Sequence, residues 1–350
     1  MITGEYKTPG GKLVRVELDV ADGVIVSASV SGDFFLEPDD ALGVINEALV
    51  GAPTALGTPA LATRIEDALP PGVQLVGFDA NAVASAAGRA LGAVAAWDGL
   101  AFDVIPPVTL PPAWHVALDE VIAAEVAAGR RLPTLRFWDW DEPLVVIGSF
   151  QSVRNEVDEE AAARYGIKVV RRITGGGAMF MEPGNCVTYS LVVPNSLVAG
   201  MSYQASYAFL DQWVIGALAA VGVQARYVPL NDIASDAGKI GGAAQRRFAT
   251  GVVLHHVTMS YDIDADKMMQ VLRIGREKLS DKGIKSANKR VDPMRSQTGL
   301  PREAIMRAFI DHFMGLYNSQ LSAYTPRELV DAQDLANTKF TSPEWTYRVP

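Results

Sequence analysis

The sequence predicts an α+β protein with two domains, and three observations lead to this expectation. The chain has 350 residues, which is about the length of two average domains. Stretches that alternate apolar and polar residues are mixed with stretches that space apolar residues three and four apart, which indicates both strands and helices. Prolines cluster in residues 103–112. We therefore expect a domain at 1–102, a linker at 103–112 and a second domain at 113–350.

The first part of the chain predicts a hairpin followed by helices. Residues 12–30 alternate apolar and polar positions around Ala21-Asp22-Gly23, a turn sequence that tolerates positive φ. Pro38 then precedes apolar residues with helical spacing, and this pattern predicts a helix over residues 37–49. Further helices are expected at 58–68 and 81–96. These elements make a small α+β domain.

The stretch 103–112 contains Pro106, Pro107, Pro111 and Pro112. Proline fixes φ and has no backbone N–H to donate, so it interrupts both helices and sheet ladders. We therefore expect no regular structure in this stretch.

The second part alternates between helices and strands, which predicts a domain with mixed sheets and flanking helices. Helical periodicity covers residues 113–128, and apolar runs separated by further helices follow. The expected strands are 134–138, 144–147, 168–171, 186–193, 225–228 and 251–254. The expected helices are 156–165, 203–221 and 264–272.

Composition excludes several classes of function. The 31 basic and 40 acidic side chains give a net charge of −9, so no general positive field attracts nucleic acid or anionic lipid. A single cysteine excludes an intramolecular disulfide and a cysteine-based zinc cluster, and it favours a reducing compartment. The apolar stretch 82–97 is interrupted by Arg89 and is too short to span a bilayer. We expect a cytoplasmic protein without nucleic-acid or membrane partners.

The most informative segment is residues 169–180, VVRRITGGGAMF. A predicted strand ends at Arg171 and Arg172, and three glycines follow after Ile173 and Thr174. Glycines without Cβ atoms let backbone N–H groups approach an anion closely, so the segment predicts a phosphate cradle. It has neither Walker A nor Rossmann spacing. A glycine-rich turn with solvated arginines remains an equally weighted alternative.

A second segment contains Asn231 and Asp232 and then Lys239 between glycines. A lysine in a glycine-bracketed hairpin turn places a compact charge on a carboxylate or phosphate without crowding it. Asn231 and Asp232 supply oxygen ligands of the kind that Mg²⁺ prefers. Taken alone, Lys239 fits an exposed turn lysine better than a functional group.

Two further candidates favour structural roles. His255 and His256 are neighbours in a predicted strand and so point to opposite faces, which favours structural or substrate-lining roles over metal binding. Cys186 could serve as an acyl-accepting nucleophile. Its position in an apolar run instead favours a small buried side chain.

In their order along the chain, these segments resemble the lipoate–protein ligases of the biotin/lipoate ligase fold, from Trp114 onward. Outside the segments above, the matching positions are 135–138, Gly148, Gln151, 184–185, 278–279, 285–286, 290–291, 340–342 and 344–345. Two departures are Met181-Glu182, where the family usually has His-Asp, and Val257, where it usually has Gly. The segments 11–14, 22–25 and 31–35 resemble the accessory domain that such ligases usually carry after the catalytic domain or as a separate subunit.

This resemblance implies an ATP- and Mg²⁺-dependent ligase that converts lipoate to lipoyl-AMP and pyrophosphate. The lipoyl group then passes to a lysine of a carrier protein, either a lipoyl domain or a glycine-cleavage H-like protein. It also implies that Lys239 bridges the carboxylate and the α-phosphate, and that Asp232 holds Mg²⁺ or the acceptor amine. The implied nucleotide-binding residues are Arg172, Gly175, Gly176, Gly177, Ala178, Met179, Phe180, Asn231, Lys239 and Ala244. The implied lipoate pocket contains Val170, Arg171, Trp138 and His255.

Three alternatives stay open. One is octanoyl or lipoyl transfer from an acyl carrier, for which Cys186 is the available acyl-accepting cysteine. Another is a lipoyl-protein binding partner without adenylation activity. Biotin ligation is the third, although the biotin loop differs from residues 172–177.

Overall fold

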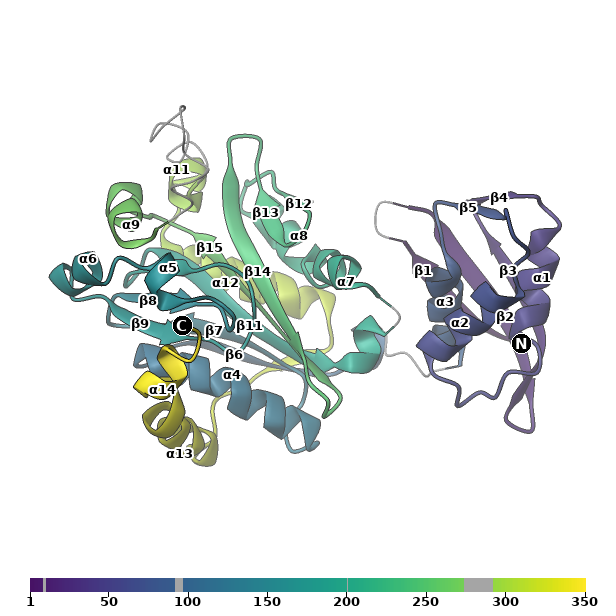
Figure 1. Cartoon of the computed structure of the whole chain (residues 1–350), viewed down its shortest axis with the longest axis horizontal. Helices are drawn as coiled ribbons and strands as arrows, with labels where there is room; N and C mark the ends of the chain where they lie inside the picture. The colour runs from purple at the N-terminus through teal and green to yellow at the C-terminus, as the bar shows by residue number, and fades with distance from the viewer. Residues whose placement is uncertain (9–10, 92–96, 200, 274–291) are drawn as a thin grey trace. The chain divides into compact units, whose positions relative to one another are not determined.

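The computed structural model describes residues 1–8, 11–91, 97–199, 201–273 and 292–350. The chain forms two compact units, whose helices and strands are labelled in Figure 1. Unit 1 contains residues 1–100 and 195–209, and unit 2 contains residues 101–194 and 210–350. The mixture of sheets and helices confirms the predicted α+β class.

Unit 1 contains a three-stranded antiparallel sheet with helices packed on it. Its strands are β1 (Ile2–Lys7), β2 (Leu13–Ala21) and β3 (Val24–Gly32), and a short pair is formed by β4 (Phe35–Glu37) and β5 (Gln74–Val76). Its helices are α1 (Ala41–Leu49), α2 (Thr58–Ala68) and α3 (Ala80–Ala90), with short turns η1 (Trp97–Gly99) and η2 (Asn195–Val198). Val14, Val16 and Leu18 alternate along β2 and are fully buried, as the period of a half-buried strand requires.

The expected hairpin of unit 1 is confirmed. Asp22 and Gly23 have φ values of 51° and 75°, which is the pair of left-handed residues that a two-residue hairpin turn needs. The helix expected at 58–68 is also confirmed. The helix expected from residue 37 begins at Ala41, and α3 ends at Ala90. Residues 92–96 lie outside the described residues.

Unit 2 is built on an eight-stranded mixed sheet in the order β12-β13-β14-β15-β11-β7-β6-β16. In chain order these strands are β6 (Phe102–Thr109), β7 (Thr134–Asp139), β11 (Cys186–Pro194), β12 (Arg226–Val228), β13 (Asp232–Ala234), β14 (Lys239–Arg247), β15 (Val252–Ser260) and β16 (Ser319–Leu321). A second sheet has the order β10-β8-β9, with β8 (Leu144–Ile147), β9 (Lys168–Arg171) and β10 (Met179–Met181).

Helices cover both faces of the large sheet. His255 and His256 are neighbours in β15 and point to opposite faces; the first bonds Asp211 at the start of α8 and the second bonds Asp119 of α4. The helices α4 and α8 therefore lie on opposite faces of the sheet. The helices of unit 2 are α4 (Pro112–Ala127), α5 (Val153–Glu156), α6 (Glu159–Arg164), α8 (Gln212–Ala220), α9 (Ala265–Val271), α11 (Met294–Thr298), α12 (Arg302–Leu316), α13 (Pro326–Leu335) and α14 (Pro343–Thr346), with α7 (Tyr203–Leu210) at the division between units and η4 (Ala336–Phe340) after α13.

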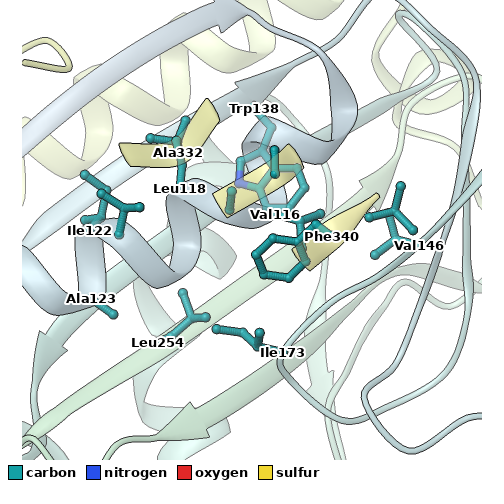
Figure 2. Close-up of a cluster of buried hydrophobic side chains, with 14 of the residues drawn as sticks. Val116, Leu118, Ile122, Ala123, Trp138, Val146, Ile173, Leu254, Ala332 and Phe340 are labelled. Carbon is teal, nitrogen blue, oxygen red and sulfur yellow. The ribbon is translucent and has the colours of Figure 1, made fainter. Parts of the chain in front are cut away.

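The main core of unit 2 lies where α4 meets the sheets. Figure 2 shows Leu118 and Ile122 of α4 in one cluster with Trp138, Leu254 and Phe340. These side chains come from segments far apart in the sequence, and each is at most 3% exposed. This core fixes the ends of β7, β9 and β15, which carry the site described below.

The expectation of no regular structure at residues 103–112 is wrong. Residues 102–109 form β6, which lies inside the large sheet between β7 and β16. The register with β7 shifts between Ile105 and Val108, so Pro106 and Pro107 occupy an irregularity where the ladder does not need their missing N–H groups. Pro112 begins α4, the helical position that tolerates proline best.

Two other expectations for unit 2 need correction. The helix expected at 203–221 is divided into α7 and α8 at Asp211. Lys239 is not a turn residue but the first residue of β14, a strand that was not expected. None of the helices that the structure describes is long and apolar enough to cross a membrane.

Candidate active site

A cavity in unit 2 lies between the glycine loop (residues 174–177), the start of β14 and the strands β11 and β15. It contains ≈ 600 Å³ of empty space when the open solvent at its mouth is included. Its lining contains both polar and apolar side chains. The sequence-predicted residues that line it are Trp138, Arg172, Gly177, Ala178, Met179, Asn231, Lys239 and Ala244.

Arg172 shapes the glycine loop. Its Nη2 donates hydrogen bonds to the carbonyl oxygens of Gly175 at 2.6 Å and Gly177 at 2.9 Å. Gly176 has a φ of 89°, a conformation that favours glycine. A Cβ at Gly177 would meet no atom within 4 Å, so open space lies beside this residue. The loop therefore has the closely folded backbone and the room that an anion cradle requires.

Lys239 lines the cavity and forms an ion pair with Asp232, a predicted site residue that is not part of the lining. Lys239 Nζ lies 2.7 Å from Asp232 Oδ1, and the two side chains are 48% and 37% exposed. Gly242 lies opposite Asp232 in the β13–β14 ladder, and a Cβ there would lie 3.1 Å from Lys239 Nζ. Asn231 Nδ2 donates to Ala243 O at 2.6 Å. Glycine at position 242 thus leaves room for the ammonium group, which carries a positive charge beside the cavity.

A chain of buried hydrogen bonds connects the glycine loop to the core. Arg172 Nε donates to Thr174 Oγ1 at 2.9 Å, and Thr174 Oγ1 lies 2.7 Å from His256 Nε2. His256 Nδ1 lies 2.8 Å from Asp119 Oδ2, and Arg136 Nη2 donates to the other oxygen of Asp119 at 2.5 Å. The carboxylate accepts a proton from Nδ1, so the network assigns Nε2 as the acceptor of the Thr174 hydroxyl.

The protonation states of this chain follow from burial and charge. Burial lowers the pKa of His256, and Asp119 offsets only part of this effect, so the ring is neutral at pH 7. Burial alone would raise the pKa of Asp119, but Arg136 and His256 together hold it below its usual value. A charged aspartate and a neutral histidine keep each hydrogen-bond direction in the chain fixed.

Asp119 and Arg136 were not among the predicted site residues, and His256 was predicted only to have a structural or substrate-lining role. Charged residues inside the apolar stretches 116–126 and 135–138 were the available signal, because charges in buried elements need partners. Which residues pair could not be read from the sequence, since Asp119 and His256 are 137 positions apart.

His255 is a correction to the predicted lipoate pocket. It is fully buried on the other face of β15, where its Nε2 lies 2.7 Å from Asp211 Oδ1. His256 lines the cavity in its place. The strand period predicts that only one of the two neighbours faces the site, but not which one.

Arg171, Val170 and Phe180 are also placed away from the cavity wall that the structure describes. Arg171 is fully buried and its hydrogen-bond partners in the described chain are backbone carbonyl oxygens. Val170 belongs to the main core, and Phe180 packs in a neighbouring cluster with Val145 and Ile147. Gly175 and Gly176 belong to the loop without lining the cavity.

Cys186 lies outside the cavity lining. It is fully buried as the first residue of β11, and its Sγ lies 3.9 Å from Phe180 O. Burial raises the pKa of the Cys186 thiol to about 12, whereas a nucleophilic cysteine needs a stabilised thiolate. The side chain behaves as the small buried group that its sequence context predicts.

The apolar part of the cavity wall contains Trp138, Val146, Met179 and Met181. Trp138 is held by a hydrogen bond from its Nε1 to Ser190 Oγ at 2.8 Å. Within the described ranges, no group of three or more His, Cys, Asp or Glu side chains could hold a metal ion. The cavity lining thus combines apolar side chains with Arg172, Lys239 and one glycine of the loop, Gly177. The predicted motifs at 278–279, 285–286 and 290–291 lie outside the described residues.

Comparison with known proteins gives matches to one family over most of unit 2. The model of the lipoyl protein ligase A/B catalytic domain matches residues 111–314. The octanoyltransferase LipM of Geobacillus kaustophilus is 28% identical over 267 residues, which are 68% of this chain and 95% of that protein.

Two solved structures are similar as well. The bipartite lipoate protein ligase of Thermoplasma acidophilum, studied together with its E2 lipoyl domain, is 28% identical, with a TM-score of 0.63 over 71% of this chain and 97% of that one. A lipoate-protein ligase A bound with ATP is 25% identical, with a TM-score of 0.61 over 71% of this chain and 99% of that one.

Proposed function

Because the chain belongs to the lipoyl protein ligase A/B family, we propose that it is an ATP-dependent lipoate–protein ligase. It converts lipoate and ATP to lipoyl-AMP and pyrophosphate and then transfers the lipoyl group to a lysine of a carrier protein. The observation that carries this proposal is the position of Cys186, the one cysteine of the sequence. It is buried outside the cavity lining, which supports activation of the acid without a protein thiol.

The cavity supports both substrates of the first step. Its apolar wall with Trp138 suits the dithiolane chain, while Lys239 and the glycine loop suit the carboxylate and the phosphates. The similar ligase A structure is bound with ATP, and we extend that ligand to this chain. The main role that we give Arg172 is to hold the glycine loop by its hydrogen bonds to two loop carbonyl oxygens. The direct phosphate contact that the sequence predicts is a second role.

Adenylation needs positioning and charge stabilisation. A lipoate oxygen attacks the α-phosphorus, a bond to that phosphorus forms, and the bond to the β-phosphate oxygen breaks as pyrophosphate leaves. Lys239, which lines the cavity, would contact both groups and lower the energy of the negative charge that develops. In the second step the acceptor amine attacks the acyl carbonyl and AMP leaves. Asp232, 2.7 Å from Lys239, is placed to hold that amine.

Mg²⁺ fits this site as a cofactor shared with the nucleotide. Asp232 and Asn231 are adjacent oxygen donors. Mg²⁺ bound to a nucleotide needs only one or two ligands from the protein, because phosphate oxygens supply others. When bound, the ion neutralises phosphate charge. Asp232 is the residue that would hold the ion, as the alternative to its contact with the acceptor amine.

The second candidate is octanoyl transfer, which the similarity to LipM over 95% of that protein favours. A cysteine acyl-enzyme would require the Cys186 thiol to ionise and reach the cavity. The thiol is fully buried, and burial raises its pKa to about 12. The high pKa and the burial of the thiol therefore favour the ligase over the octanoyltransferase.

We also propose a lipoyl domain or an H-like protein as the acceptor, and unit 1 as an accessory domain acting in the same chain. The similar ligase of Thermoplasma acidophilum is bipartite and was studied with an E2 lipoyl domain. The cytoplasmic location remains a prediction from the sequence.

The test is transfer to an apo lipoyl domain, measured by mass spectrometry. We expect lipoyl attachment only with lipoate, ATP and Mg²⁺ present together. Modification from octanoyl-carrier protein without ATP would move the assignment to the transferase. Carrier binding without modification in either mixture would assign a non-catalytic partner, and incorporation of biotin instead of lipoate would assign a biotin ligase.

A further inference from the structure

The segment 345–348, here named the clasp, lies against β9 and reaches a turn beside the glycine loop. Trp345 Nε1 donates to Arg171 O at 2.9 Å, and Arg171 Nη2 donates to Thr346 O at 2.6 Å. The guanidinium of Arg348 lies 4.1 Å from the Trp345 ring centre. Trp345 belongs to a segment that resembles the lipoate–protein ligases, but the proposed function gives this residue no role.

Arg171 also donates hydrogen bonds to the turn formed by residues 148–151, so it connects the clasp with this turn. Its Nη1 donates to the carbonyl oxygens of Gly148 at 2.9 Å and Gln151 at 2.6 Å. Arg348 Nη2 donates to Ser149 O at 2.7 Å. A fully buried guanidinium bonded to neutral carbonyls is costly to desolvate. Its geometry nevertheless fixes several backbone groups at once, as a planar donor with five N–H groups can.

The turn at residues 148–151 lies directly against the glycine loop. Ser149 N donates to Thr174 O at 2.7 Å. A Cβ added to Gly148 would lie 2.1 Å from Gly176 O, so the two backbones approach as closely as glycine permits. Any displacement of the turn therefore displaces Thr174 and Gly176.

We propose that the clasp is a positioning element for nucleotide activation, with Trp345 and Arg171 as positioning residues that hold the glycine loop through the 148–151 turn. This inference rests on the proposed ligase function for its catalytic consequence. Neither side chain touches the cavity that the structure describes, so their effect on ATP is indirect. Displacement of a phosphate cradle by about 1 Å is enough to lower a rate about 10²-fold.

The first experiment measures hydrogen–deuterium exchange of the amides of residues 174–178 in the full-length chain. Trp345→Phe removes one hydrogen bond but keeps an aromatic ring, and Arg171→Lys removes the planar fork. We expect faster exchange in the loop for both variants, and the larger effect for Arg171→Lys. Trp140→Phe is the matched control, because Trp140 is buried in the core and its Nε1 has no hydrogen-bond partner in the described chain.

The second experiment compares ATP–pyrophosphate exchange with lipoate binding. We expect Trp345→Phe to raise the KM for ATP about 3–10-fold, as loss of one hydrogen bond does. We expect Arg171→Lys to lower kcat/KM for ATP about 10²-fold. The Kd for lipoate measured without ATP should stay within about twofold, and Trp140→Phe should leave the KM for ATP unchanged.

Arg348→Met gives a milder variant if Arg171→Lys does not fold, and it should raise loop exchange and the KM for ATP in the same direction. Unchanged loop exchange and an unchanged KM for ATP, together with a lowered Tm, would overturn the proposal and leave the clasp a structural element. A wild-type chain without pyrophosphate exchange contradicts the ligase function instead. The deuterium-exchange comparison still decides the role of the clasp in that case.

Discussion

Lys239 is the residue on which the proposed chemistry depends most directly. Its ammonium group lies at the cavity, 2.7 Å from Asp232 and beside Gly242. It is the first residue of a strand and is half-exposed, so its side chain contributes little to packing. We therefore propose charge stabilisation as its main role.

We expect Lys239→Ala to lower the rate of lipoyl-AMP formation by about 10²–10³-fold, as loss of one preorganised donor does. The unfolding temperature should change little. Lys168→Ala is the control, since Lys168 is exposed and pairs with Glu142 on the surface. Lipoyl-AMP formation close to wild type in Lys239→Ala would remove the lysine from the mechanism.

His115 gives a residue-scale prediction about pH. Burial lowers its pKa to about 3, with Arg136 adding to the effect, and its ring stacks on Trp138 at 5.2 Å. The unfolded chain binds a proton at this position below about pH 6.5, whereas the folded chain does not until about pH 3. Its contribution to stability is therefore present above pH 6.5 and is lost as the pH falls.

Urea unfolding at pH 5.5 and 4.5 measures this contribution. We expect His115→Gln to lose less stability than wild type over this interval, by about 1.4 kcal/mol per pH unit. Glutamine can keep one donor and one acceptor in the site. Equal slopes for the two proteins would show that His115 titrates alike in the folded and unfolded states.

At the scale of elements, a buried ion pair anchors α13 beside α4. Arg131 Nη2 lies 2.7 Å from Glu328 Oε2, and the same carboxylate accepts the Thr325 N–H in a capping box. Both charged side chains are at most 5% exposed. Removing one partner leaves the other charge buried without its main counterion.

We expect Glu328→Ala to lower the free energy of unfolding by up to about 3–5 kcal/mol. Glu303→Ala is the matched control, because Glu303 is exposed in the first turn of α12 and should change stability by less than about 0.5 kcal/mol. Urea unfolding of the three proteins checks both values. A loss for Glu328→Ala as small as that of the control would mean that the pair adds nothing to stability.

Some elements are predicted correctly from the sequence and others are not. Alternation predicts β2 and β3 correctly, and the glycine run locates the loop at the cavity. The strand β14 has the sequence KIGGAAQRR, which lacks the alternation that would predict a strand. The strand β6 is not predicted because it contains two prolines, which lie at a shift of its register with β7.

At the site itself, the motifs and their resemblance to a known family identify residues that line the cavity, but not the residues that support them. The Asp119–His256 pair joins a helix to a strand 137 positions later, and Arg171 reaches both residues 148–151 and residues 345–346. Such contacts depend on the final fold rather than on local periodicity. Arg171, which the sequence predicts in a lipoate pocket, lies outside the cavity lining and donates to backbone carbonyl oxygens.

At the scale of the whole molecule, the change between units falls at Leu100–Ala101, while β6 begins at Phe102. A chain that begins at Ala101 keeps every strand of the large sheet, whereas one that begins at Ala113 lacks β6 and the start of α4. We expect the first to unfold cooperatively and the second not to fold, as circular dichroism and urea unfolding can show. Cooperative unfolding of the shorter chain would contradict the place of β6 in the sheet.

Unit 1 leads to a prediction about activity. If it is an accessory domain, it excludes water from the reactive anhydride during adenylation, and a shared chain keeps its local concentration high. The chain that begins at Ala101 should form lipoyl-AMP more slowly than the full chain, and added residues 1–100 should restore part of the rate. Residues 195–209 group with unit 1 and remain on the longer piece. Equal rates with and without unit 1 would contradict the accessory role.

We propose that the protein activates its acid through an adenylate and not through Cys186. ATP–pyrophosphate exchange measures this activation, with lipoate, octanoate and biotin compared in wild type and in Cys186→Ala. We expect exchange with lipoate at similar rates in both proteins, because the thiol is buried outside the cavity lining. Absence of exchange in wild type, together with an octanoyl group found on Cys186 after incubation with octanoyl-carrier protein, would contradict the claim.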